Sequence, residues 1–215
     1  MSKHFNCDKP EERAQGLREA AKAVRQGGLV VLPTDTVYGI GADAFTPDAV
    51  AALLKAKGRG REMPVPVLIG SSDALHSLVM PSGTASWQLT DAFWPGPLTL
   101  VAVQQPSLEW DLGETRGTVA VRMPLHPVAI DLLNDTGPVA VSSANRSGQP
   151  PATTAGEAVV QLGNAVSVYL DSGPTGEPVP SSIVDITTET PRLLREGAIS
   201  LAELLDVVPN LEVDT

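Results

Sequence analysis

The sequence predicts an α/β fold in one domain, residues 1–215, built on a mixed sheet with parallel and antiparallel strands. Stretches with helical periodicity alternate with short apolar stretches typical of strands, and no segment repeats. The chain has 215 residues and is 42% hydrophobic, which suits one large core. Two consecutive strands near the middle, and two near the end, are too close in sequence for a crossover helix, so these pairs should be antiparallel.

The first elements follow from local signals at their ends. Pro10 favours the first turn of a helix that we predict to end at Gly27. The next stretch, Leu29–Leu32, is apolar at every position, which predicts a strand covered on both faces of the sheet. Thr46 is then expected to cap a second helix, Pro47–Lys57.

The remaining elements alternate along the chain. Further strands are predicted at Val65–Ile69, Leu98–Val103, Val119–Arg122, Val139–Val141, Val166–Leu170, Ser182–Ile186 and Arg192–Leu194. Helices are predicted near Thr84–Phe93, Pro127–Asn134 and Thr154–Leu162. A capping box from Ser200 to Glu203 predicts one more helix.

The charge of the chain favours a small anionic ligand over a nucleic acid. The formal net charge is −10, and only nine basic residues follow residue 25. All nine fall at or beside stretches that suit the binding of phosphates or carboxylates. They are Lys55, Lys57, Arg59, Arg61, Arg116, Arg122, Arg146, Arg192 and Arg195.

Several classes of protein are disfavoured. Cys7 is the only cysteine, so an intramolecular disulfide or a cysteine cluster for a metal is excluded. His4 (in an end expected to be frayed), His76 and His126 lack the spacing of metal ligands, so we expect no metal site made of protein side chains. No apolar run approaches the ~18 residues of a membrane span, and no signal segment is visible, so we predict a cytoplasmic location and no membrane association.

Two loops carry the strongest local signals. Pro33–Gly41 follows the first buried strand and combines two glycines with three short polar side chains, which is typical of a binding loop, although an ordinary capped turn has the same residues. Lys55–Arg61 places four cations at a helix end, more than the helix dipole needs. We interpret this loop as a grip for a triphosphate; a solvated basic loop is the alternative.

Three more strand ends open into polar residues. Thr118–Pro124 delivers Arg122, which suits a carboxylate or a structural salt bridge. Val139–Gly148 and Ser181–Gly197 contain short apolar strands that break into small polar residues and arginines. Ligands of open α/β sheets bind at such strand ends.

With these motifs in place, the chain resembles the threonylcarbamoyl-adenylate synthases, the YrdC-like family, in their short single-domain form. The matching motifs are Pro33-Thr34-Asp35-Thr36-Val37-Tyr38-Gly39, Lys57-x-Arg59, Trp94-Pro95-Gly96-Pro97-Leu98-Thr99, Val121-Arg122-x-Pro124, Ser143-Ala144-Asn145 with Ser147-Gly148, and Leu194-Arg195-x-Gly197. The resemblance implies a twisted open sheet with a large concave basic cleft. It also implies that L-threonine, bicarbonate and ATP give threonylcarbamoyl-AMP and pyrophosphate, with magnesium. Partner transferases would then use the product to modify the adenosine next to the anticodon in tRNA.

The same resemblance implies roles for individual residues. Lys57 and Arg59 are expected to be catalytic. The expected threonine contacts are Thr36, Arg122, Ser181 and the backbone of Val141. The expected ATP contacts are Lys57, Arg59, Thr118, Ser143, Asn145 and Arg195. Magnesium is expected to arrive with ATP, without protein ligands, and no tightly bound organic cofactor is expected.

Two departures leave alternatives open. Leu68 stands where the family often has a histidine, which puts one threonine contact in doubt. The longer members append a further domain, and none is expected here. The chain could instead be a module that binds tRNA or double-stranded RNA, with steep salt dependence of its affinity. It could also be an enzyme of the same fold with another carbamoyl donor or acceptor, in which case pyrophosphate release would not depend on threonine.

Overall fold

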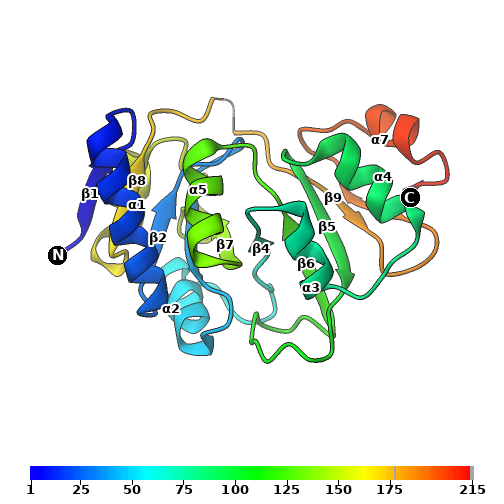
Figure 1. The fold of residues 1–215 in the computed structure, drawn as a ribbon, viewed down its shortest axis with the longest axis horizontal. Coiled ribbons are helices and arrows are strands. Elements are labelled where there is room, and N and C mark those ends of the chain that lie inside the picture. The colour runs from blue at the N-terminus through cyan, green and yellow to red at the C-terminus, as the bar shows by residue number, and fades with distance from the viewer. Residues whose placement is uncertain (177, 214–215) are drawn as a thin grey trace.

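The computed structural model describes residues 1–176 and 178–213, which fold around one sheet of eleven strands (Figure 1). The strand order is β1-β8-β2-β3-β7-β4-β6-β5-β9-β10-β11. The strands are β1 Lys3–Asn6, β2 Val30–Leu32, β3 Gly39–Asp43, β4 Val67–Leu68, β5 Leu98–Val103, β6 Thr118–Arg122, β7 Val139–Ser143, β8 Val168–Asp171, β9 Ser182–Asp185, β10 Arg192–Arg195 and β11 Glu212–Val213. The helices are α1 Pro10–Arg25, α2 Pro47–Lys57, α3 Leu75–Leu78, α4 Thr84–Phe93, α5 Pro127–Thr136, α6 Ala155–Leu162 and α7 Leu201–Val207, with short 3-10 helices at Ser72–Ala74 and Gly163–Ala165.

The sheet is mixed, which confirms the predicted fold class. The two strand pairs without room for a crossover, β5 with β6 and β9 with β10, are both antiparallel. Strands β1, β8 and β2 run parallel to one another, and so do β5 and β9. Strands β8 and β9 follow each other in the chain but lie far apart in the sheet, with six strands between them.

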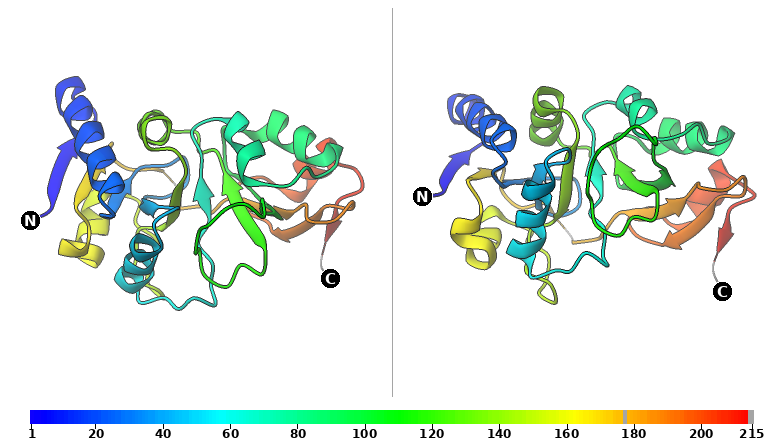
Figure 2. Two further views of the ribbon diagram at one scale, coloured as in Figure 1. Left: turned by 60° about the horizontal axis from the view of Figure 1, so that its bottom comes forward. Right: turned by 90° about the horizontal axis from the view of Figure 1, so that it is seen from below.

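Helices cover both faces of the sheet. Helices α1 and α5 lie on one face, and α2 and α6 lie on the other (Figure 2). Val30 and Leu32 pack in the layer of α1 and α5, whereas Leu29 and Val31 pack in the layer of α2 and α6. The prediction that this stretch is buried on both faces is confirmed.

Most helix ends lie where their local signals predicted. Helix α2 ends at Lys57, and Gly58 follows in the left-handed conformation (φ 63°). The capping box of Ser200 and Glu203 begins α7 as predicted. Thr46 occupies the N-cap position of α2, as predicted, but its hydroxyl donates to Asp43 Oδ2 (2.8 Å) and makes no capping bond to the helix. In the described part of the chain, no helix is long and apolar enough to cross a membrane.

Three strands were not predicted from the sequence. Strand β1 is mostly polar because it lies at an edge of the sheet, where His4 stacks on Tyr169 with ring centroids 4.8 Å apart. The expectation of a frayed end at His4 was therefore wrong. Strand β3 contains Gly39 and Gly41, which we had assigned to the binding loop, and β11 is a short exposed strand at the other edge.

The glycines of β3 serve packing within the sheet. A Cβ atom on Gly39 would lie 2.5 Å from Cγ1 of Val141, and one on Gly41 would lie 2.9 Å from Cγ1 of Val139. Bare backbone in β3 therefore makes room for the valines of β7.

The sheet has a narrow seam in its middle. Strand β4 has two residues, where five were predicted, and pairs with β7 on one side and β6 on the other. Prolines 64 and 66 just before it lack the N–H groups that a longer ladder would need. The sheet thus consists of two broader halves joined through β4.

Candidate active site

A cavity of about 570 Å³ lies over the central strands and is called here the central cavity. Its walls come from β3 to β7, β9 and β10, and from the loops that follow β2 and precede β9. Eight residues proposed from the sequence line it: Thr36, Arg59, Thr118, Arg122, Val141, Ser143, Ser181 and Arg195. No Asp or Glu is among its described lining residues. The fold thus brings together side chains from five separate sequence motifs.

Arg122 at the end of β6 is buried and held by three protein acceptors. Its Nε donates to Gly96 O (3.0 Å), one terminal nitrogen to Thr36 Oγ1 (3.0 Å) and the other to Asp35 Oδ1 (2.6 Å). Burial lowers the pKa of the Arg122 guanidinium, and the nearby Asp35 carboxylate counteracts this effect. A guanidinium has five N–H groups, so one on each terminal nitrogen is left for a ligand. Both sequence interpretations of Arg122, a salt bridge and a carboxylate site, are compatible with this geometry.

The loop after β2 is fixed by its own hydroxyl groups. Thr34 Oγ1 donates to Val37 O (2.7 Å) and accepts from the Thr36 N–H (3.2 Å). Both hydroxyls are buried and lie 3.1 Å apart. Asp35 Oδ1 also accepts from the N–H of Leu125, which ties the loop to the chain after β6 (2.9 Å). Thr36 is thereby held at the cavity wall beside Arg122.

Ser181 and Arg195 form the opposite wall. The guanidinium of Arg195 donates twice to Ser181 O (3.0 and 2.7 Å) and once to Ser181 Oγ (3.2 Å). Ser181 Oγ also lies 2.8 Å from Thr99 Oγ1. Burial lowers the pKa of Arg195. Thr99 is a cavity residue that sequence reasoning did not assign, although it ends one of the recognised motifs.

Arg59 reaches the cavity from the loop after α2. Its terminal nitrogens donate to Ser142 Oγ (3.2 Å) and Pro64 O (3.4 Å), both long bonds. Its Nε is buried and has no partner in the described structure. Burial lowers the pKa of Arg59. A guanidinium with few and long protein contacts, at the wall of a cavity whose described lining lacks carboxylates, favours an anionic ligand.

Lys57 is placed differently from its predicted role as a mobile phosphate-binding charge. It is 3% exposed, does not line the central cavity, and donates to Ser143 O and to Asn145 O (2.8 Å for the latter). Burial, and secondarily the charge of Arg59, lower the pKa of Lys57 to about 8. Lys57 therefore braces the loop after β7 from behind.

Asn145 is part of the same brace. Its amide nitrogen donates to Arg146 O (2.9 Å) and Gln149 O (2.8 Å), while its Oδ1 is buried without a partner in the described structure. It is absent from the lining of the central cavity, unlike its neighbour Ser143. We infer that Asn145 shapes the loop that presents Ser143.

The backbone carbonyl of Val141 is a free hydrogen-bond acceptor because the residue opposite it is a proline. Its N–H donates to Pro66 O (2.8 Å), so the two residues face each other across β7 and β4. Proline has no N–H to donate in return. The carbonyl of Val141 is thus left without its ladder partner, on a residue that lines the central cavity.

Two further lining residues complete the walls. Thr118 directs its hydroxyl to Thr115 O (2.8 Å) at the start of β6. Leu68 pairs with Arg122 across β4 and β6 and is 5% exposed, so an apolar side chain lines the cavity near the arginine.

Comparisons with known proteins agree with this geometry. The family model Sua5/YciO/YrdC, described as "Telomere recombination", matches residues 22–197. A Mycobacterium tuberculosis H37Rv protein with the provisional name threonylcarbamoyl-AMP synthase is 56% identical over 208 residues, which is 97% of this chain and 96% of the relative. The Bacillus subtilis threonylcarbamoyl-AMP synthase is 37% identical over 200 residues, 92% of this chain and 58% of the relative.

A solved structure shares the whole fold. The crystal structure of Pyrococcus abyssi Sua5 complexed with L-threonine superposes with a TM-score of 0.91 at 34% identity. The match covers 100% of this chain and 62% of that chain, so the chain spans less than two thirds of that relative.

Proposed function

The chain belongs to the Sua5/YciO/YrdC family, and on this premise we propose that it is a threonylcarbamoyl-AMP synthase. The enzyme joins L-threonine, bicarbonate and ATP to form threonylcarbamoyl-AMP and pyrophosphate, for the modification of tRNA. The observation that carries the proposal is the central cavity, where Arg59, Arg122 and Arg195 converge without a carboxylate in the described lining. Three anionic groups, a carboxylate, a bicarbonate and a triphosphate, need such a site.

Threonine would bind at the wall formed by β6 and β7. The two remaining N–H groups of Arg122 suit the substrate carboxylate, with the hydroxyls of Thr36 and Ser181 beside it. The carbonyl of Val141 suits the substrate amino group, because an amine donates and this carbonyl lacks a ladder donor. Leu68 would face the substrate with methyl groups instead of a polar side chain.

ATP would occupy the rest of the cavity. Arg59 and Arg195 suit the phosphates, with Thr118 and Ser143 as neutral contacts. Lys57 and Asn145, which the sequence had suggested as direct contacts, would act by holding the loop of Ser143 in place. Two buried atoms without a partner in the described structure, Arg59 Nε and Asn145 Oδ1, would gain one from water.

The chemistry needs positioning more than a protein nucleophile. The threonine nitrogen attacks the carbon of bicarbonate, and loss of water leaves an N-carboxylate. An oxygen of this carbamate then attacks the α-phosphorus of ATP, the α–β phosphoanhydride bond breaks, and pyrophosphate leaves with the electron pair. Arg59 and Arg195 offset the charge that develops on the phosphates.

Magnesium would enter with ATP and supply further charge neutralisation, since this ion prefers phosphate oxygens together with water. The described residues contain no group of three or more His, Cys, Asp or Glu side chains suited to a metal.

The product would be consumed by tRNA-modifying threonylcarbamoyl transferases in the cytoplasm. Threonylcarbamoyl-AMP is a mixed anhydride, so a transferase that attacks its carbonyl carbon releases AMP. Direct contact of this chain with tRNA or double-stranded RNA is not needed for that transfer.

The test is pyrophosphate release from ATP with magnesium and bicarbonate, with and without L-threonine. Release that needs both threonine and bicarbonate, and that serine and glycine support poorly, would support the proposal. Release without threonine would contradict it and favour another acceptor. Absence of release from a folded protein that binds RNA with steep salt dependence would favour the RNA-binding alternative.

A further inference from the structure

The cations without carboxylate partners are distributed unevenly. Of the nine basic residues after residue 25, three form salt bridges in the described structure: Arg61 with Asp111, Arg122 with Asp35, and Arg192 with Asp185. The other six are Lys55, Lys57, Arg59, Arg116, Arg146 and Arg195. Arg59 and Arg195 line the central cavity, and Lys55, Lys57 and Arg146 line a different one.

This second cavity has a volume of about 610 Å³ and is called here the helix-end cavity. It lies where three helices end: Gly27 and Gly28 follow α1, Lys55 and Lys57 end α2, and Leu162 ends α6. No Asp or Glu is among its described lining residues. None of its residues has a role in the proposed reaction except Lys57, which acts there from behind the loop.

Two of these cations, Lys57 and Arg146, are tied together by contacts of the loop after β7. Lys57 donates through Nζ to Asn145 O and accepts through its own carbonyl from the Ser147 N–H (2.8 Å each), so Arg146 is held between two contacts to Lys57. The Nε of Arg146 donates to Gln161 O (2.8 Å), and its backbone N–H to Gln161 Oε1 (3.0 Å). The terminal nitrogens of Arg146 have no acceptor among the described residues.

The charge of this cavity exceeds what the helix ends require. A helix C-terminus carries about −0.5 of an elementary charge, so three of them amount to about −1.5. The ammonium of Lys57 is already engaged by Ser143 O and Asn145 O, so Lys55 and Arg146 remain. Two cations against about −1.5 leave a positive balance of roughly 0.5 charges in a chain whose net charge is −10. Dipole compensation therefore explains much of the cluster, and the terminal nitrogens of Arg146 are left for a ligand.

We propose that the helix-end cavity is a second anion site, which binds a small molecule bearing phosphate groups. Arg146 would supply a planar fork and Lys55 a mobile charge, the combination that suits phosphate oxygens. A small anion is favoured over RNA because the chain is strongly acidic and repels an extended polyanion.

Occupancy of this site would be felt in the central cavity. Ser143 lines the central cavity and Arg146 lines the helix-end cavity, and Lys57 holds the loop that contains both. An anion on Arg146 and Lys55 would therefore act on the back of the wall that faces ATP.

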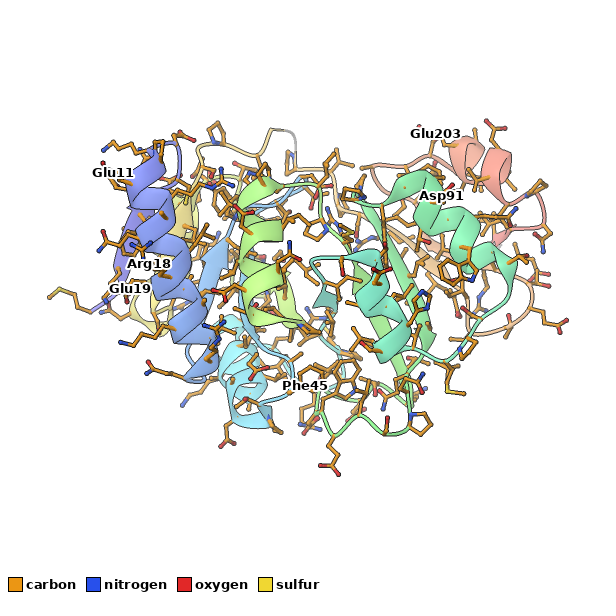
Figure 3. The ribbon with its side chains drawn as sticks, in the orientation of Figure 1. Glu11, Arg18, Glu19, Phe45, Asp91 and Glu203 are labelled. Atoms are coloured by element: carbon orange, nitrogen blue, oxygen red, sulfur yellow. The ribbon has the colours of Figure 1, made fainter. Side chains whose placement is uncertain are left out.

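The test is calorimetric titration of the full chain with pyrophosphate as the probe, without magnesium. We expect two binding events in the wild type, and the loss of one, or its weakening by at least ~10-fold, in the variant K55A/R146A. The matched control is R18A/K22A, which removes two cations that lack salt bridges from α1, where Arg18 lies on the helix (Figure 3). Both pairs are exposed, and each variant is first checked for wild-type urea unfolding. If K55A/R146A fails, K55Q/R146Q replaces it, and if R18A/K22A fails, R18Q/K22Q replaces it.

The outcomes separate this site from the proposed function. The variant R59A/R195A should retain the helix-end event and lose the other one; if it loses neither, the proposed use of the central cavity is wrong while the second site stands. Identical isotherms for K55A/R146A and R18A/K22A would overturn the second site. Binding of a short RNA duplex that K55A/R146A abolishes would also overturn it, if pyrophosphate gives no heat that the same variant removes.

Discussion

Replacing Lys57 and Arg59 in turn should separate two roles that the sequence alone assigns to one loop. The sequence predicts a catalytic role for both residues, so loss of turnover is expected in either alanine variant. In the structure Lys57 is a buried brace with two carbonyl acceptors, whereas Arg59 is half-buried at the cavity wall. We therefore expect Lys57→Ala to lose stability as well as turnover, and Arg59→Ala to lose turnover only.

The expected loss for Lys57→Ala follows from three contributions. Two carbonyl oxygens lose their donor, at about 1–3 kcal/mol each. Three buried methylene groups are removed, at about 0.8 kcal/mol each, or about 2.4 kcal/mol in total. Relief of the buried charge offsets about 3 kcal/mol, because a pKa lowered from 10.5 to about 8 costs about 1.4 kcal/mol per unit. The balance is a destabilisation of about 1–5 kcal/mol, centred near 3.

For Arg59→Ala the same reasoning gives less than about 1 kcal/mol, because two long hydrogen bonds are lost while an unsatisfied buried Nε is removed. Its turnover should fall by ~100-fold or more, as for a lost charge-stabilising donor.

The assay is urea unfolding followed by tryptophan fluorescence, together with threonine-dependent pyrophosphate release. For a chain of this size, about 3 kcal/mol corresponds to a melting temperature lower by about 6–12 °C. Unfolding of Lys57→Ala at the wild-type urea concentration would refute its role as a brace. Equal destabilisation of both variants would refute the distinction between the two residues.

Three further results are expected. The pKa of Lys57 is about 8 in the folded protein and 10.5 in the unfolded chain, so between these pH values only the unfolded chain keeps the proton. The stability of wild type relative to Lys57→Ala should therefore rise with pH from 8 to 10.5 and be lost as the pH falls through 8. Urea midpoints across this range test the sign. Arg122→Lys should raise the KM for threonine by ~10-fold or more with the KM for ATP unchanged, since an ammonium cannot keep Asp35 and also offer a carboxylate fork; steady-state kinetics with each substrate varied decide this. Gly39→Ala should cost about 1–3 kcal/mol by overpacking against Val141, and Val141→Ala should recover part of it in a double-mutant cycle; additive effects would contradict the contact.

The helix ends were predictable because their signals are local. A proline in the first turn and a glycine after the last one mark α2 within the chain itself, and the capping box of Ser200 and Glu203 needs only four residues. The continuous apolar stretch Leu29–Leu32 likewise contained enough information to place β2 inside the sheet. The family motifs further indicated which loops would meet.

The partners of the site residues were not predictable. Arg122 meets Asp35, 87 positions away, and Lys57 meets backbone carbonyls 86 and 88 positions away. Every residue has a backbone carbonyl, so no residue type in the sequence reveals that the ammonium of Lys57 will donate its hydrogen bonds to two of them. The glycines of β3 posed the same difficulty, because a strand that makes room for neighbouring valines resembles a flexible loop when read alone.

The narrow seam at β4 has a mechanical consequence. Thr36 belongs to the half of the sheet with β2 and β3, and Ser181 and Arg195 belong to the half with β9 and β10, so a substrate seated between them ties both halves together where the sheet has only two paired residues on either side of β4. We expect bound substrates to stabilise the contact between the two halves. In hydrogen–deuterium exchange, the amide protons of β4 should then be slowed by both substrates by a larger factor than those of β5 or β8. An enzyme held across this narrow seam by its own substrates should unfold most readily when no substrate is bound.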